Sequence, residues 1–209
     1  QQQRVALARA LAPQPRLLLL DEPFSSLDVE LRQRLAQELR DILKRAGTTA
    51  LLVTHDPLEA FAVGDRVGVM QHGRLRQWDS GDALYHQPAD RFVAGFVGQG
   101  AFVQAQRIRR DGRVLLRTGL GDFADGRDLA QAGERCELLL RAEAVRLDAD
   151  AAVRARIERR EFRGAGVLCT LRLDNGESVL ALLPSHDGHR VGERVGIRAE
   201  PQRLVTFAR

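Results

Sequence analysis

The first third of the chain alternates between helical and strand-like hydrophobic patterns. Residues 1–12 repeat apolar side chains at helical spacing, and this pattern ends at two prolines. Residues 29–45 repeat them along one side of an amphipathic helix, which Gly47 is suited to end. Between these helices, residues 17–20 are four consecutive leucines, which predicts a strand buried on both faces of a parallel sheet.

The same alternation continues through the next predicted elements. Residues 49–54 are rich in β-forming side chains and predict a second buried strand. A short helix over residues 58–62 and a strand over residues 65–71 follow, and His72-Gly73 predicts the turn after that strand. Because strands and helices alternate, we predict an α/β fold with a parallel sheet for this part of the chain.

The pattern changes near residue 98. Residues 80–97 predict two short helices around Pro88, and short alternating segments with Gly-, Asp- and Asn-rich turns follow them. Asp174-Asn175-Gly176 is a hairpin signal between two of these segments. We therefore place a domain boundary at about residue 98 and predict a small all-β barrel or sandwich beyond it. Its predicted strands include residues 114–117, 136–141, 153–159, 167–173, 178–183 and 194–199.

Composition leaves this fold prediction unchanged and reduces the number of possible functions. The chain has 209 residues and a net charge of +4, and it is 44% hydrophobic and 29% charged, as in an ordinary globular protein. Its basic residues are nearly all arginines, interleaved with acids, whereas a nucleic-acid binder usually clusters them in a stripe with aromatics. No run approaches the ~18 apolar residues that span a membrane. We predict that the two cysteines are buried free thiols.

The segment Leu-Leu-Leu-Leu-Asp-Glu-Pro, residues 17–23, carries the strongest chemical signal. A hydrophobic strand brings Asp21 and Glu22 to the carboxyl edge of a parallel sheet, where such sheets bind ligands. Successive strand residues point to opposite sides, so the two carboxylates can serve different roles. One can hold Mg²⁺, directly or through water, and the other can orient or deprotonate an attacking water. An isolated Asp-Glu pair, however, is more typical of a solvated strand end.

Three further motifs accompany Asp21-Glu22-Pro23 in a fixed order. They are the helix that begins Gln1-Gln2-Gln3-Arg4, the loop Ser25-Ser26-Leu27-Asp28 and the segment Thr54-His55-Asp56. With these motifs the chain resembles the ATP-binding-cassette (ABC) subunits of membrane transporters over about residues 1–75. The resemblance implies that residues 1–97 are the C-terminal part of a P-loop NTPase domain, with a parallel sheet and helices.

The resemblance implies a role for each of these motifs. Asp21 resembles the Walker B aspartate that supports Mg²⁺ through water, and Glu22 resembles the catalytic glutamate that polarises the attacking water. His55 resembles the switch histidine, whose imidazole can hydrogen-bond the γ-phosphate. Gln1 resembles the last residue of the nucleotide-associated signature Leu-Ser-Gly-Gly-Gln. The D-loop, which crosses to the partner subunit of an ATPase dimer, is matched by Ser25, Ser26, Leu27 and Asp28.

Residues 98–209 extend the resemblance to the regulatory β-domain of importer ATPases, called TOBE, of OB-like type. Phe96-Val97-Gly98 resembles the junction between the two domains. Residues 138–143 resemble a recurrent Ile-Arg-Pro-Glu segment, with Ala142 where Pro is usual. Among importers of ferric iron, sulfate, polyamines or sugars, residues 84–90 and 98–100 look most similar to those of ferric-iron importers.

The resemblance as a whole implies the energy-coupling ATPase subunit of an importer, which uses ATP and Mg²⁺ to drive uptake of a small solute, here ferric iron. Its expected partners are a second copy in an ATPase homodimer, integral membrane permease subunits and, indirectly, a periplasmic or extracellular solute-binding protein. Nucleic acid is not among them. The expected location is peripheral, on the cytoplasmic face of the inner (plasma) membrane.

The sequence lacks the phosphate-binding pattern Gly-x-x-x-x-Gly-Lys-Ser/Thr, and its single lysine, Lys44, has no flanking glycines. The Q-loop of the family is also missing. We therefore expect an N-terminally truncated subunit that is inactive alone. In it, residues 17–20 would lose neighbours on one side, and residues 1–75 would be marginally stable or prone to association.

Two alternative functions stay open at this stage. Residues 98–209 could act as a non-catalytic regulatory module that binds a small anion, a metal complex or a partner subunit. The chain could also come from a soluble ABC ATPase that acts on nucleic acid or ribosomes. The importer-like β-domain argues against the latter, and few aromatic side chains are available for stacking on bases.

Overall fold

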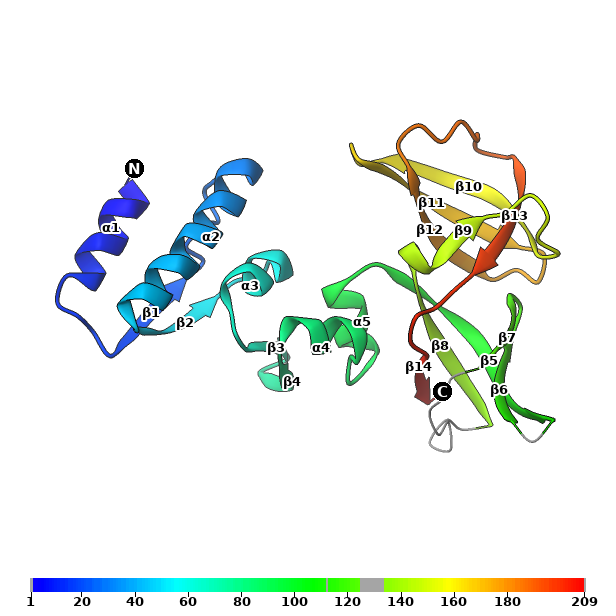
Figure 1. The fold of residues 1–209 in the computed structure, drawn as a ribbon, viewed down its shortest axis with the longest axis horizontal. Coiled ribbons are helices and arrows are strands. Elements are labelled where there is room, and N and C mark those ends of the chain that lie inside the picture. Colours follow the sequence, from blue (N-terminus) through cyan, green and yellow to red (C-terminus); the bar gives the residue numbers. More distant parts are fainter. Residues whose placement is uncertain (1, 112, 125–133, 209) are drawn as a thin grey trace. The chain divides into compact units, whose positions relative to one another are not determined.

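The computed structural model describes residues 2–111, 113–124 and 134–208, with side chains from Val5 onward. The chain divides into two compact units, residues 1–85 and 86–209 (Figure 1). The first unit contains a two-stranded parallel sheet, a β-hairpin and most of the helices, and the second contains two five-stranded sheets. None of the helices in the described ranges is long and apolar enough to cross a membrane.

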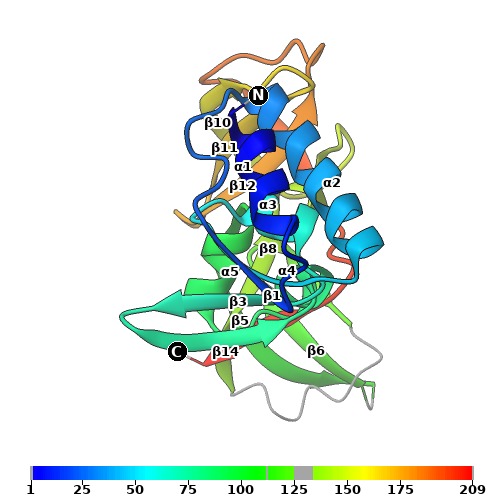
Figure 2. The same cartoon turned by 90° about the vertical axis from the view of Figure 1, so that its left-hand side faces the viewer.

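The first unit follows the predicted alternation of helix and strand. Its parallel sheet pairs β1 with β2 in a register that runs from Leu17 opposite Thr49 to Asp21 opposite Val53. The helices α1 and α2 lie side by side in both views (Figures 1 and 2). The elements are α1 (Gln2–Leu11), β1 (Leu17–Asp21), α2 (Val29–Ala46), β2 (Thr49–Val53), α3 (Pro57–Val63), β3 (Val67–Gln71), β4 (Arg74–Asp79) and α4 (Gly81–His86).

Local signals fix the ends of α2 and the turn of the hairpin. The Asp28 side chain accepts a hydrogen bond from the Leu31 N–H at 2.9 Å and caps the start of α2. Gly47, with φ of 62°, ends the helix in the left-handed conformation that favours glycine. His72 and Gly73, with φ of 50° and 73°, form the turn between β3 and β4. The predicted cap and turn are therefore confirmed.

The parallel sheet is covered on one face, where α1 and α2 pack. Leu18 is 6% exposed and belongs to the core of this unit, together with Leu39 and Leu43 of α2. In contrast, Leu17 and Leu19 are 53% and 67% exposed. Leu51 and Val53 of β2 are 50% and 53% exposed. The prediction that residues 17–20 are buried on both faces is therefore wrong, and the predicted buried strand over residues 49–54 is likewise exposed on one face, because within the described residues the helices pack against one side of the sheet.

The second unit encloses one hydrophobic core between two antiparallel sheets. Their strand orders are β12-β11-β10-β13-β9 and β14-β8-β5-β6-β7. Strands 114–117 and 136–141 and the four later predicted strands are all present. The elements are α5 (Arg91–Val97), β5 (Gly100–Arg110), β6 (Arg113–Thr118), β7 (Gly121–Phe123), β8 (Arg135–Arg141), a 3₁₀ turn (Ala142–Ala144), β9 (Val145–Leu147), β10 (Arg154–Phe162), β11 (Gly166–Leu173), β12 (Ser178–Pro184), β13 (Arg194–Ala199) and β14 (Val205–Ala208).

Helix α5 packs with the second unit. The Arg91 guanidinium forms an ion pair with the buried Glu137 of β8 and lies 4.4 Å from the centre of the Phe102 ring. Arg141 also donates a hydrogen bond to the Ala94 carbonyl at 2.9 Å. The compact units accordingly divide at residues 85 and 86, before α5. The boundary at about residue 98 stays a prediction about the division between sequence domains.

Candidate functional site

Glu22 and His55 come together because β1 and β2 are parallel. The carboxyl ends of parallel strands meet at one edge of a sheet, where ligands bind in such folds. The Glu22 N–H donates to the Val53 carbonyl at 2.9 Å, which continues the pairing one residue beyond β1. His55 follows Val53 by two residues, so both side chains lie at this edge.

The backbone at Glu22 adopts an uncommon conformation. Its φ is 46°, in the left-handed region that side chains with a Cβ rarely occupy. The Ser25 N–H and hydroxyl both donate to the Glu22 carbonyl, at 3.3 Å and 3.0 Å, and they hold the turn that follows β1. Backbone conformations of this kind cluster at active sites and are kept by the surrounding structure.

The side chains of Glu22 and His55 are in direct contact. The His55 Nδ1 lies 2.8 Å and 2.9 Å from the two carboxylate oxygens of Glu22. The imidazole is 74% exposed and the carboxylate 34% exposed, so both can meet a ligand. The hydrogen bond to Glu22 and then the Glu22 charge raise the pKa of His55 above its ordinary value of 6.5, with smaller contributions from Glu59 and Asp56.

The remaining predicted site residues are placed as follows. Asp21 is the last residue of β1 and is exposed beside Glu22. Residues 25–28 form the loop between β1 and α2, in which Ser25, Ser26 and Asp28 are exposed and Leu27 is half-buried. Gln1 lies outside the described residues.

The carboxylates at the sheet edge suit a magnesium ion that is also bound by substrate phosphates, and they do not suit a metal ion held by protein side chains alone. No group of three or more His, Cys, Asp or Glu side chains in the described ranges is arranged to hold a metal ion. Mg²⁺ usually keeps several waters and takes one or two carboxylates together with substrate phosphates. The exposed oxygens of Asp21 are suited to that role. Lys44 lies elsewhere, at the end of α2, and pairs with Asp65 at 2.7 Å.

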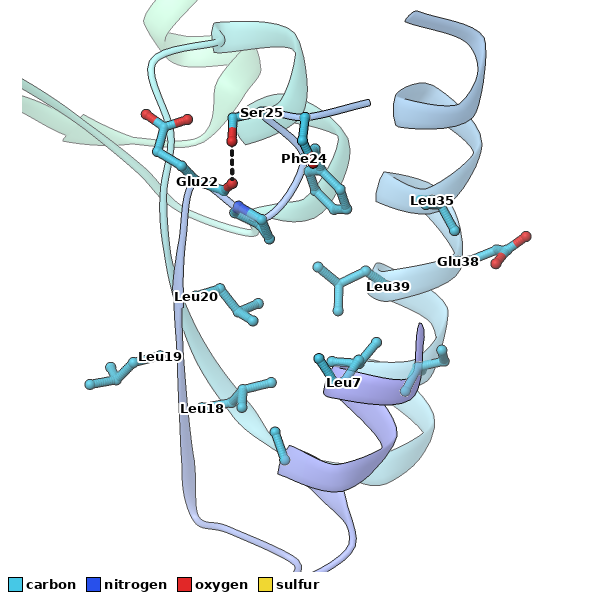
Figure 3. A pocket seen from close by; sticks show the side chains of 15 residues that line it. Leu7, Leu18, Leu19, Leu20, Glu22, Phe24, Ser25, Leu35, Glu38 and Leu39 are labelled. Carbon is cyan, nitrogen blue, oxygen red and sulfur yellow. Dashed lines mark hydrogen bonds between the residues drawn. The ribbon is translucent and has the colours of Figure 1, made fainter. Parts of the chain in front are cut away.

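An apolar cavity of about 400 Å³ lies on the helical side of β1. Leu18 and Leu20 of β1 and Leu39 of α2 point into it, whereas the Glu22 carboxylate and Leu19 point away (Figure 3). The cavity therefore continues the hydrophobic core, and the charged groups of the site face a different side of the strand.

Two charged residues next to the site were missed in the sequence analysis. Glu59 of α3 is only 5% exposed, and Arg32 of α2 reaches toward it. The available signal was the spacing of Asp56 and Glu59, which is that of an N-terminal capping box. Such a signal predicts a helix start and gives no indication that the glutamate is buried.

Two family models match the chain. The TOBE domain model matches residues 138–207, within the second unit. A model described as "AAA domain, putative AbiEii toxin, Type IV TA system" matches residues 2–60, which include Asp21, Glu22 and His55. The matches agree with the predicted fold class, an α/β region followed by a TOBE-type β-domain.

Curated proteins with similar sequences cover both units. The spermidine/putrescine import ATP-binding protein PotA 1 of Pseudomonas aeruginosa is 41% identical over 91% of the chain and 53% of its own length. The corresponding PotA of Ruegeria pomeroyi is 48% identical over 72% of the chain and 41% of its length. The Fe(3+) ions import ATP-binding protein FbpC of Streptomyces avermitilis is 43% identical over 99% and 59%. The chain thus spans about half the length of these relatives.

Proposed function

Because the chain belongs to the family of ABC importer ATP-binding subunits, we propose that it supplies the hydrolytic part of such a subunit, which couples ATP hydrolysis to solute import. The observation that carries this proposal is the contact between Glu22 and His55 at the carboxyl edge of a parallel sheet. The similarity of the chain to PotA and FbpC proteins over most of the length of the chain supports the same conclusion.

In the proposed mechanism Glu22 orients the attacking water and accepts its proton. The His55 imidazole has two ring nitrogens, of which Nδ1 faces Glu22. When the imidazole is protonated, which the raised pKa of His55 favours, Nδ1 donates to the Glu22 carboxylate and Nε2 can donate a hydrogen bond to a γ-phosphate oxygen. Asp21 would hold Mg²⁺ through water, and this ion neutralises charge on the phosphates when bound.

The phosphates themselves need donors that this chain does not offer. A phosphate-binding loop uses backbone amides of a glycine-rich turn and a lysine, and no such pattern occurs in the 209 residues. We propose that residues 1–209 are inactive alone and that the loop is contributed by sequence outside them. Residues 25–28 would then face a second copy of the subunit in an ATPase dimer.

The proposed partners follow from the family. Closure of two ATPase subunits on ATP would move integral membrane permease subunits between inward- and outward-facing states. The subunit would be peripheral, on the cytoplasmic face of the membrane, and a solute-binding protein would act indirectly.

We propose Fe³⁺ as the transported solute, on the similarity of residues 84–90 and 98–100 to ferric-iron importers. The relatives are named for import of spermidine/putrescine and of Fe(3+). Uptake of radiolabelled iron and of radiolabelled spermidine by cells that carry the complete transporter separates the two. Uptake of spermidine alone would overturn the assignment of iron.

A regulatory function of the β-rich unit is the second candidate. This unit has a hydrophobic core of its own between its two sheets, and a TOBE domain matches it. If it acts as a regulator only, the isolated unit should bind a small ligand tightly, and the Glu22 carboxylate should be dispensable.

The test of the proposed function is Glu22→Gln in the full-length subunit that contains residues 1–209. The amide keeps the shape of the side chain but cannot accept a proton, so kcat should fall by about 10²–10⁴-fold. ATP binding, measured by calorimetry, should persist, because Glu22 acts on the water. Unchanged ATP turnover would contradict the role given to Glu22.

A further inference from the structure

A carboxylate that the hydrolytic roles do not use is buried beside the site. Glu59 of α3 is 5% exposed, and a charge so placed must be paired and hydrogen-bonded. The Thr54 hydroxyl donates to Glu59 Oε2 at 2.5 Å, and Arg32 Nε lies 3.4 Å from Oε1. Glu59 is therefore bound both to α2 and to the residue that precedes His55.

Arg32 of α2 contacts two other segments at once, the loop after β1 and the start of α3. Its Nη2 donates to the carbonyl of Leu27, in the loop after β1, at 3.0 Å. Its Nη1 donates to Asp56 Oδ2 at 3.4 Å, and its Nε faces Glu59 at ion-pair distance. The planar guanidinium offers donors in a fixed fork, so its two hydrogen bonds and the ion pair hold the loop after β1 and the start of α3 relative to α2.

The residues on both sides of His55 take part in the same network. The Asp56 N–H donates to the Thr54 hydroxyl oxygen at 3.1 Å. The Asp56 side chain accepts from the Leu58 N–H at 2.8 Å and caps α3. Because Thr54 and Asp56 are both held, the backbone of His55 has little freedom to move away from Glu22.

We propose that Arg32, Thr54, Asp56 and Glu59, the Arg32 cluster, position His55 against Glu22 and link this contact to the loop of residues 25–28. Through Leu27 and Arg32, a displacement of that loop by a second ATPase subunit is transmitted to His55 along residues that do not themselves touch ATP. These four are positioning residues, and the inference rests on the proposed function.

The test compares variants of the full-length subunit that contains residues 1–209. Thr54→Val keeps the shape of the side chain but removes the hydroxyl, and Arg32→Ala removes the contact with Leu27. Each should lower kcat by about 10- to 100-fold, the cost of a misplaced catalytic group, and change KM for ATP less than about threefold. Thr54→Ser keeps the hydroxyl and should recover most of kcat.

Arg34→Ala provides the matched control, because Arg34 lies on the same helix, is 61% exposed and pairs with Glu38 at 3.9 Å. It should leave kcat and KM unchanged. Thermal unfolding of each variant separates misplacement of His55 from loss of the fold. If Arg32→Ala does not fold, the comparison of Thr54→Val with Thr54→Ser still tests the positioning role.

Each outcome decides between the two proposals. If Glu22→Gln lowers kcat as expected while Thr54→Val keeps the wild-type kcat, the positioning role fails and the proposed function stands. If Thr54→Val and Thr54→Ser lose kcat equally, the hydroxyl is not what matters and the inference is overturned. A full-length subunit that hydrolyses no ATP would contradict the proposed function and, with it, this inference.

Discussion

The two units of the chain differ in how completely they bury their strands. In the β-rich unit, Leu138 of β8 and Ile157 of β10 are fully buried in a core closed by two sheets. In the α/β unit, Leu19 of β1 and Val53 of β2 remain 67% and 53% exposed, although both belong to strands. The unit that carries the proposed hydrolytic groups thus leaves its strands more exposed, and the unit matched by a TOBE domain has a closed core.

The largest difference should appear in stability. Leu138→Ala should lower the free energy of unfolding of the β-rich unit by about 2–5 kcal/mol, since it leaves a cavity in a closed core. The same change at Leu19, which is 67% exposed, should cost less than about 0.5 kcal/mol. Urea denaturation of both variants measures the two values, and equal losses would contradict the comparison.

The exposed strand face also bears on the behaviour of the α/β unit. Exposed apolar patches of this kind, here Leu17, Leu19, Leu51 and Val53, favour association. The expectation that residues 1–75 are marginally stable or associate remains a prediction, which this face supports.

A smaller effect is expected in the titration of His55. Its pKa is raised by Glu22, so the protonated form is favoured in the folded state. The contribution of this pair to stability is therefore fully present below the ordinary pKa of 6.5 and is lost as the pH rises through the raised pKa. Glu22→Gln should lower the pKa of His55, as followed by NMR of the imidazole protons. A pKa that stays raised would show that Glu22 is not the cause.

Much of the fold could be predicted because local signals were strong. The four leucines at residues 17–20 and the turn His72-Gly73 define their elements almost by themselves. Strand β5 was missed because its inward positions include the small residues Ala101 and Ala105, which give a weak alternating pattern. Burial of both faces of β1 was predicted from its run of four leucines, but it depends on what packs against the strand.

The residues of the candidate site could be named from the sequence, whereas their contacts could not. Asp21, Glu22 and His55 were identified by motif, whereas the contact between Glu22 and His55 joins residues 33 positions apart and depends on the pairing of β1 with β2. Burial of Glu59 depends likewise on where α2 places Arg32. Neither arrangement has a signature in the local sequence.

The central claim is that residues 1–209 carry the groups that act on the attacking water, whereas the groups that hold the phosphates lie outside them. Calorimetric titration of MgATP into this chain tests the claim most directly. The account predicts no detectable binding, because the phosphates lack a glycine-rich loop and its lysine. Tight binding accompanied by hydrolysis would contradict it, since the phosphates would then be held by residues within this chain.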